Sequence, residues 1–327
     1  MKGTIMLKRL AIIVPAILVV CLTISYPFCR GRFYASKIIK AVQQNDVDAV
    51  KSLLNKGANI NAKNSVGETL LIISIEHKCK EITNLLLQKG ADVNIKQNTY
   101  TMTEDQLPSY LKQFISKPAK TIIVGGRSAL HLAVFKDDMD LIDTLLAKGA
   151  NIDAVDAQGE TPLSHAVIDG QIEIIKLLLS KGANVNIKNH EFGMTPLHLA
   201  VIIPFDCKTE IINLLLEHGA DIDAVTNKGD TAIQYAANYF AANHSEIVKL
   251  LISKGANVNI QNAYGATLLH SASRKGDSSL VKILLSNGAK PNIKDNDGKT
   301  PLDIAIKEGH SEIVIILKEH GVKRVPS

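Results

Sequence analysis

Residues 159–188 read GETPLSHAVIDGQIEIIKLLLSKGANVNIK, and nearly the same phrase returns at 193–222 and at 298–321. A glycine, usually followed by alanine, closes each copy and lets the repeat be counted along the chain. These glycines are Gly57, Gly90, Gly149, Gly182, Gly219, Gly255 and Gly288, with Gly321 closing the last copy. Successive glycines are separated by 33, 59, 33, 37, 36, 33 and 33 residues. This period indicates a chain built from one small unit used many times.

Each unit has the signals of two short helices. In residues 159–188, Thr161 can cap a helix that begins at Pro162, where a missing N–H costs nothing. Apolar residues follow at helical spacing, and a second, mostly apolar helix is predicted over 172–179. Gly182 then suits the left-handed position that ends a helix. Two such helices cannot bury their apolar faces alone, so the units must stack on one another.

The repeated phrase G-x-T-P-L-x-x-A, followed by an apolar helix and GA-[ND]-[VI]-[ND], resembles the ankyrin-repeat family. The T-P-L motif is complete at Thr161-Pro162-Leu163, Thr195-Pro196-Leu197 and Thr300-Pro301-Leu302. The family's usual histidine follows at His131, His198 and His270, where the resemblance implies structural hydrogen bonds at the helix start. It also implies an all-α ankyrin-repeat solenoid of helix-turn-helix units joined by β-hairpin loops. Protein partners are then expected on the concave face and the hairpin tips, with no cofactor.

The repeat boundaries define the expected domain organisation. An ankyrin-repeat domain is predicted over 34–321, in about eight units whose first and last members act as caps. It is preceded by a basic stretch at 1–9, an apolar segment at 10–28 and a short linker at 29–33. A tail at 322–327 follows it.

The apolar segment at 10–28 contains no charged residue, and Lys8 and Arg9 precede it. Nineteen helical residues approach the thickness of a bilayer core, so the segment could be an uncleaved membrane anchor. The alternative is a secretory signal that is removed, with secretion or periplasmic export as the outcome, and Cys21 leaves lipidation as a third alternative. In each case the segment predicts targeting to or across a membrane. Basic residues on both sides leave the orientation open.

The net charge of +5 is not evidence for nucleic-acid binding. Seven of the 37 basic residues precede Asp46 and no acidic residue does, which leaves 30 basic residues against 32 acidic ones in the repeats. The repeats lack the basic stripe with interleaved aromatic residues that nucleic-acid surfaces display. No nucleic acid, small-molecule substrate or metal is therefore expected as a ligand.

No known catalytic motif is present in the sequence. It contains no G-x-S-x-G, no phosphate-binding loop, no H-E-x-x-H and no C-x-x-C. The prediction is therefore a non-catalytic scaffold for protein–protein interaction. The alternatives are an enzyme whose site lies in the 96–126 segment, for which Glu104-Asp105 alone is poor material, and a dedicated protective partner of one envelope protein.

Departures from the repeat are the candidate interaction sites. The largest inserts 26 residues near 97–124, where Tyr110 and Phe114 belong to an apolar stripe at helical spacing. This stripe could bind a partner, or it could fold back and cover an edge of the solenoid. Two smaller insertions between paired helices carry Phe205, Tyr239 and Phe240, which could form one aromatic patch or cap their own helices.

Overall fold

The computed structural model describes residues 34–102, 122–204, 206–239 and 244–320. The chain divides into two compact units, 1–151 and 152–327. Predictions for the leader at 1–33, the helical stripe within 103–121 and the tail at 322–327 lie outside the described residues.

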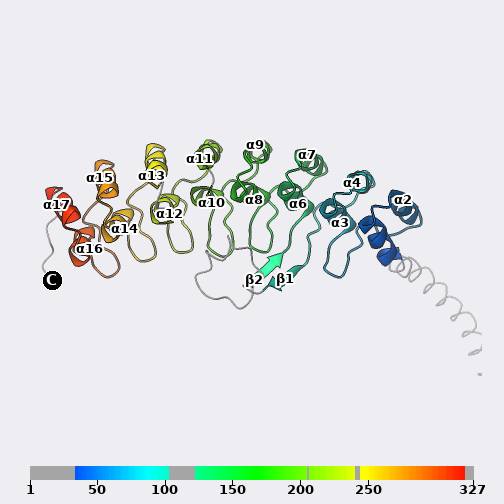
Figure 1. Ribbon diagram of the computed structural model, residues 1–327, viewed down its shortest axis with the longest axis horizontal. Helices are drawn as coiled ribbons and strands as arrows, with labels where there is room; N and C mark the ends of the chain where they lie inside the picture. Colours follow the sequence, from blue (N-terminus) through cyan, green and yellow to red (C-terminus); the bar gives the residue numbers. More distant parts are fainter. Residues whose placement is uncertain (1–33, 103–121, 205, 240–243, 321–327) are drawn as a thin grey trace, which may run out of the picture. The chain divides into compact units, whose positions relative to one another are not determined.

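The N-terminal unit is built from paired helices. A helix over 34–43 precedes α2 (Val47–Asn55), α3 (Leu70–Glu76), α4 (Lys80–Gln88), α6 (Ala129–Phe135) and α7 (Met139–Ala147). The first helix of each pair is called the inner helix and the second the outer helix. Inner helix α3 packs against its own outer helix α4 and against the next inner helix, α6 (Figure 1).

The C-terminal unit repeats the same arrangement. Its inner helices are α8 (Pro162–Ile168), α10 (Pro196–Ile202), α12 (Ala232–Tyr239), α14 (Leu268–Lys275) and α16 (Pro301–Lys307). Its outer helices are α9 (Ile172–Ser180), α11 (Lys208–Glu217), α13 (His244–Ser253), α15 (Ser278–Ser286) and α17 (Ser311–Glu319). Each inner helix packs on its neighbours in chain order (Figure 1). The prediction of an all-α fold of stacked helix-turn-helix pairs is confirmed.

The long insertion of the N-terminal unit begins and ends in a β-hairpin. Strand β1 (Thr99–Met102) pairs antiparallel with β2 (Ile122–Gly125), so that Thr99 lies opposite Gly125. The Gln97 amide continues the ladder by donating to the Arg127 carbonyl at 2.9 Å. Among the described residues, the other connections between helix pairs are turns, with isolated bridges at Lys63–Thr69 and Val225–Thr231. The predicted hairpin loops there close through tight turns, such as the Asp156 amide donating to the Glu160 carbonyl at 3.0 Å.

Threonine and proline start the inner helices as the T-P-L motif predicts. In α8 the Thr161 hydroxyl accepts a hydrogen bond from the Ser164 amide at 3.1 Å, and Pro162 occupies the first turn. In α10 the ring of His198 completes the cap, because its Nδ1 accepts from the Thr195 hydroxyl at 2.9 Å and from the Thr195 amide. His131 and His270 make the same contacts with Ser128 and Thr267. These contacts satisfy amides that a helix start leaves without partners.

Two of these histidines, His198 and His270, also connect one helix pair to the next. His198 Nε2 lies 3.2 Å from the Asp230 carbonyl, and His270 Nε2 lies 3.2 Å from the Lys299 carbonyl. Because Nδ1 accepts the cap hydrogen bonds and Nε2 donates, each ring must be neutral. Gln234 reproduces both roles at the equivalent position, with its Oε1 2.8 Å from the Thr231 amide and its Nε2 3.3 Å from the Ile260 carbonyl.

Asparagine side chains tie successive loops together. The Asn186 side chain donates to the Gly219 carbonyl at 3.0 Å and accepts from the Asp221 amide at 2.8 Å. Asn94 and Asn259 make the equivalent pair of bonds to their following loops. Asp153 occupies the same position and accepts from the Asn184 amide at 2.9 Å, but a carboxylate cannot supply the donor half of this pair of bonds. The residue at this loop position thus determines how many hydrogen bonds join one loop to the next.

A comparison of two glycines with positive φ distinguishes the cost of backbone strain from the cost of steric contact. Gly159 (φ +79°) and Gly182 (φ +85°) both adopt the left-handed region, but a Cβ at Gly159 would lie 2.6 Å from the His190 backbone nitrogen. A Cβ at Gly182 meets nothing within 4 Å. We expect Gly182→Ala to cost about 1–2 kcal/mol from strain alone. Gly159→Ala should cost clearly more, because backbone must also move. Urea unfolding of both variants checks this, and equal losses would contradict it.

The loss of folding stability at acidic pH should be traceable to His198. Burial lowers the pKa of this ring to about 4, below its ordinary value of 6.5. Because the folded-state pKa is depressed, the contribution to stability is present above pH 6.5 and is lost as the pH falls toward 4. Between pH 7 and pH 4.5 this loss is about 2–3 kcal/mol. His198→Gln, which copies Gln234, should remove that part of the pH dependence.

The measurement is the urea-unfolding free energy of wild type and variant at both pH values. Wild type and variant share all other titrating groups. The difference between their losses of unfolding free energy from pH 7 to pH 4.5 therefore isolates His198. Equal losses would show that this ring is not the acid-sensitive group.

Candidate protein-interaction surface

The aromatic residues singled out in the sequence cannot be compared in space. Tyr110, Phe114, Phe205 and Phe240 lie outside the described residues. Tyr239 ends α12, but its side chain lies outside the description as well. Their grouping into an aromatic patch therefore stays a prediction.

A different aromatic residue, Phe135, is exposed in the N-terminal unit. It is the last residue of α6, whose other six residues are all buried. Phe135 is 56% exposed, although phenylalanine is a residue that folding normally buries. The six buried residues fix the helix, so the ring is held on a rigid element.

Two cations flank the Phe135 ring. The Arg127 guanidinium carbon lies 5.7 Å from the ring centroid, and the Lys136 ammonium lies 6.0 Å from it. Both distances fall within the range of cation–π attraction, which favours a fixed position for the exposed ring. Arg127 is itself held by the Gln97–Arg127 backbone bond at the base of the β-hairpin.

Two carboxylates complete this surface. Gln97 Nε2 donates to Glu76 at 2.9 Å and to Glu68 at 3.4 Å, which brings the two acidic side chains together. Burial and then the nearby Glu68 charge raise the pKa of Glu76, while the Gln97 hydrogen bond and the Lys136 charge oppose the rise. We call this set of residues the Phe135 surface: Glu68, Glu76, Gln97, Arg127, Phe135 and Lys136.

Sequence reasoning missed the Phe135 surface because it searched the insertions and not the regular helices. The sequence did contain one usable signal, which is the residue that ends each inner helix. Inner helices α3, α8, α10 and α16 end in Glu76, Ile168, Ile202 and Lys307, so this position varies from unit to unit. An aromatic residue at a variable position beside Arg127 has the composition of interaction hot spots.

A histidine–carboxylate pair in the C-terminal unit has a structural role. His165 Nε2 lies 2.9 Å from Asp156 Oδ2, whose side chain is only 1% exposed. The other Asp156 oxygen accepts from the Gln158 and Glu160 amides and so holds the loop before α8. Ser164 cannot serve as a nucleophile for this pair, because its hydroxyl is buried against Thr161 at 3.1 Å.

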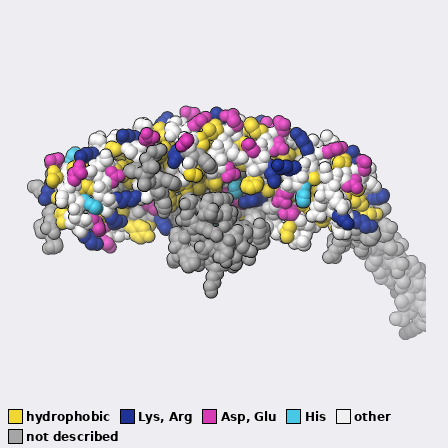
Figure 2. Space-filling model, in the orientation of Figure 1, with side chains coloured by type: hydrophobic (Ala, Val, Ile, Leu, Met, Phe, Trp, Pro, Cys, Tyr) yellow, Lys and Arg dark blue, Asp and Glu magenta, His cyan; other side chains and the backbone are white. Residues whose placement is uncertain are grey.

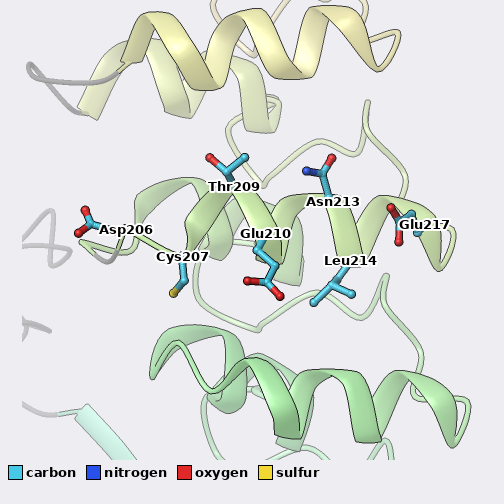
Figure 3. A pocket seen from close by; sticks show the side chains of 7 residues that line it. All are labelled: Asp206, Cys207, Thr209, Glu210, Asn213, Leu214 and Glu217. Atoms are coloured by element: carbon cyan, nitrogen blue, oxygen red, sulfur yellow. The ribbon is translucent and has the colours of Figure 1, made fainter.

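The cleft beside α11, of about 540 Å³, does not gather its polar groups at one point. Figure 3 shows Thr209 and Asn213 on one side of the helix, and Cys207, Glu210 and Leu214 on the other. Glu210 instead forms an ion pair with Lys176 of α9 at 3.2 Å. The arrangement supplies no converging set of groups for chemistry on a bound molecule.

A second cleft, of about 520 Å³, lies in the N-terminal unit. Its lining includes both lysines and aspartates from the turns before α4 and α7, among them Lys78, Lys136 and Asp138. Asp138 already caps α7 by accepting from the Leu141 amide at 3.0 Å. The mixed charges favour no single class of ligand.

The described ranges contain neither a candidate metal cluster nor a candidate membrane-spanning helix. Within them, no three His, Cys, Asp or Glu side chains are grouped so that they could hold a metal ion. Nor does any helix in these ranges combine the length and apolar character needed to cross a bilayer.

The fold and loops described above define a repeat protein of stacked helix pairs, and comparison with known proteins gives its family. A family model described as "Ankyrin repeats (3 copies)" matches residues 26–101, 103–189, 185–262 and 239–325. The chain belongs to the ankyrin-repeat family.

Similar proteins come from unrelated sources. The chain is 37% identical over 155 residues to the B-cell lymphoma 3 protein homolog of Mus musculus, covering 46% of this chain and 33% of that protein. It is 33% identical over 221 residues to the putative ankyrin repeat protein FPV031 of Fowlpox virus, covering 67% of this chain and 47% of that protein. The chain thus spans less than half the length of these relatives, and the similarity rests on the shared repeats.

Proposed function

We propose that this protein is a non-catalytic scaffold that binds a protein partner through its inner helices and loops, with the Phe135 surface as the main anchor. Ankyrin repeats generally act as protein-interaction scaffolds, and family membership supports the class of function. The observation that carries the anchor is Phe135, which is 56% exposed at the end of a rigid helix.

The chemistry of the Phe135 surface favours a partner with an apolar side chain next to a carboxylate. The ring offers apolar area without a large loss of side-chain entropy, because Arg127 and Lys136 already hold it. The same two cations can pair with a partner carboxylate at the rim of the contact. Desolvation on binding would strengthen both the cation–π and the ionic contributions.

Site-specific photo-crosslinking in the cells that make the protein tests this proposal. With a photoreactive phenylalanine analogue at position 135 of the full chain, we expect a discrete crosslinked product. Lys51, on outer helix α2 of the same unit and 47% exposed at its side chain, is the matched control position. Arg127→Glu with Lys136→Glu should reduce the product at position 135 at least tenfold. Equal crosslinking from positions 51 and 135, or no effect of the charge reversal, would overturn the anchor.

We further propose that residues 10–28 bring the repeats to a membrane, as an anchor or as a signal that is removed. The support is the run of nineteen uncharged, mostly apolar residues after Lys8-Arg9. If the segment is an anchor, Val14→Lys with Val19→Lys should shift the protein into the soluble fraction after alkaline extraction, since each lysine at mid-membrane costs about 3 kcal/mol.

Val322→Lys with Val325→Lys adds the same charge at the other end of the chain and is the control. Sequencing the N-terminus of the mature protein distinguishes an anchor from a cleaved signal. A wild-type chain that is already soluble and uncleaved would contradict membrane targeting.

A further inference from the structure

The second helix pair carries two buried hydroxyl groups at positions that are apolar in every other unit. Ser74 of α3 stands where each of the other units has alanine. These alanines are Ala41, Ala133, Ala166, Ala200, Ala236, Ala272 and Ala305. Thr83 of α4 stands where the other units have valine or isoleucine, namely Val50, Ile142, Ile175, Ile212, Val248, Val281 and Val314. Both exchanges occur in the same unit, which indicates that the two residues act together.

The two hydroxyl groups are satisfied inside their own helix pair. The Thr83 hydroxyl donates to Ser74 Oγ at 2.9 Å, and the Ser74 hydroxyl donates to the Leu71 carbonyl at 2.8 Å. Both side chains are buried. Because these hydrogen bonds need no neighbour, the hydroxyl pair loses little when water reaches it, whereas an alanine and an isoleucine are stabilised by being covered. The second helix pair is therefore held less strongly against the third.

The hydroxyl pair lines the cleft of about 520 Å³ between α4 and α7. The wall from the second helix pair also carries Lys78 and Lys80. The wall from the third helix pair carries three aspartates and one lysine, which are Asp137, Asp138, Asp140 and Lys136. Opposite charges on the two walls attract each other, yet Lys78 and Lys80 form no ion pair with any residue that the structure describes. The structure therefore shows the two walls apart.

Backbone strain marks both walls of this cleft. Lys78 and Asp137 occupy equivalent turns of successive helix pairs, and each has a φ of +57°. Later units have a glycine with positive φ at this position, namely Gly170, Gly276 and Gly309, and Asn45 of the first unit belongs to a residue type that tolerates it. A lysine and an aspartate are strained there. Strained residues that persist are associated with functional sites and switch regions, and here both line the same cleft.

Two links that join other helix pairs are missing at this junction. Figure 2 shows lysine and arginine side chains interspersed with aspartate and glutamate over the outer helices. Among them, Lys176 Nζ on α9 lies 3.2 Å from Glu210 Oε1 on α11, but the α4 residue at the position of Lys176 is Asn84. Ile72 replaces the histidine that reaches the next pair from α10 and α14. The loop bonds of Asn94 and the packing of α3 on α6 remain.

We propose that the junction between the second and third helix pairs is a hinge. The packed inner helices α3 and α6 and the loop of Asn94 form its axis, and the outer helices α4 and α7 move apart and together. In the closed state, Lys78 and Lys80 form ion pairs with the aspartates of the facing wall. In the open state, which the structure shows, those charges are solvated and the hydroxyl pair stays satisfied.

The hinge bears on the Phe135 surface, a consequence that rests on the proposed function. That surface takes Glu68 and Glu76 from the second helix pair and Phe135 and Lys136 from the third. Lys136 also lines the cleft. A change in the angle between the pairs therefore shifts the ring and its cation against the two carboxylates. The hinge itself can be measured without a partner, so it can fail while the anchor stands, and the reverse.

Distances between spin labels on neighbouring outer helices test the hinge in the full chain, kept in detergent. A genetically encoded ketone residue carries the labels and leaves the four native cysteines in place. Positions 84 and 143 report on α4 and α7, and the equivalent positions 176 and 213 on α9 and α11 are the control. Labelling position 176 removes the Lys176–Glu210 ion pair, so any bias broadens the control. We expect the distance distribution across the hinge to be at least twice as broad as the control.

The same distribution should shift to shorter distances when salt is lowered from about 0.5 M to about 0.02 M, because ion pairs across the cleft are then less screened. Lys78→Glu with Lys80→Glu should abolish this shift. Lys56→Glu with Lys63→Glu makes the same change of charge elsewhere in the N-terminal unit and should leave the shift intact.

Ser74→Ala with Thr83→Val copies the other units and should narrow the distribution to the width of the control, with unchanged circular dichroism. Equal widths for the two label pairs of the wild type would overturn the proposal. So would a broad distribution that persists in the Ser74→Ala, Thr83→Val variant, or a salt-dependent shift that survives reversal of the two lysines.

Discussion

The fold depends on the stacking of inner helices that are too short to exist alone. Most inner helices have seven residues, and isolated helices shorter than about 12–15 residues are marginal in water. In α6 only Phe135 escapes burial, so the other six residues depend on the elements around the helix. Stability is therefore a property of neighbouring pairs, and each pair depends on the next.

Stacking of this kind forces the start of each inner helix to satisfy its polar groups inside the core. Thr195 and His198 are fully buried, and the ring serves its own helix through Nδ1 and the next pair through Nε2. Gln234 does both with a different side chain, whereas the Asp303 carboxylate only accepts from Thr300. Where this position also connects its helix to the next pair, as in α10, α12 and α14, the side chain must offer an acceptor for the cap and a donor for the following loop. Histidine is one solution to that requirement, and the one that brings acid sensitivity.

The sequence predicted the elements of this fold well because each unit carries its own local signals. Thr161-Pro162 starts a helix and Gly182 follows one whatever surrounds them. The 33-residue spacing also located the extra residues between α10 and α11. The Phe135 surface was not predictable in the same way. It is assembled by Gln97, which reaches Glu76 and Glu68 across 21 and 29 residues, and by Arg127 at the far end of the insertion. The Gln97–Glu68 contact has counterparts in Asn189–Glu160 and Asn262–Asp230, but the residue types at these positions change from unit to unit. The repeat therefore encodes the contact and not its chemistry.

The proposed anchor follows from a physical property of repeat arrays. A side chain that has no neighbour to stack on can vary between units without a cost in stability, and the end of an inner helix is such a position. Phe135 occupies this position in α6 and adds little to the core of its own unit, since it is more than half exposed. An apolar residue that contributes so little to folding has its energetic effect when a second surface covers it, and the adjacent Arg127 and Lys136 restrict which surface can do so.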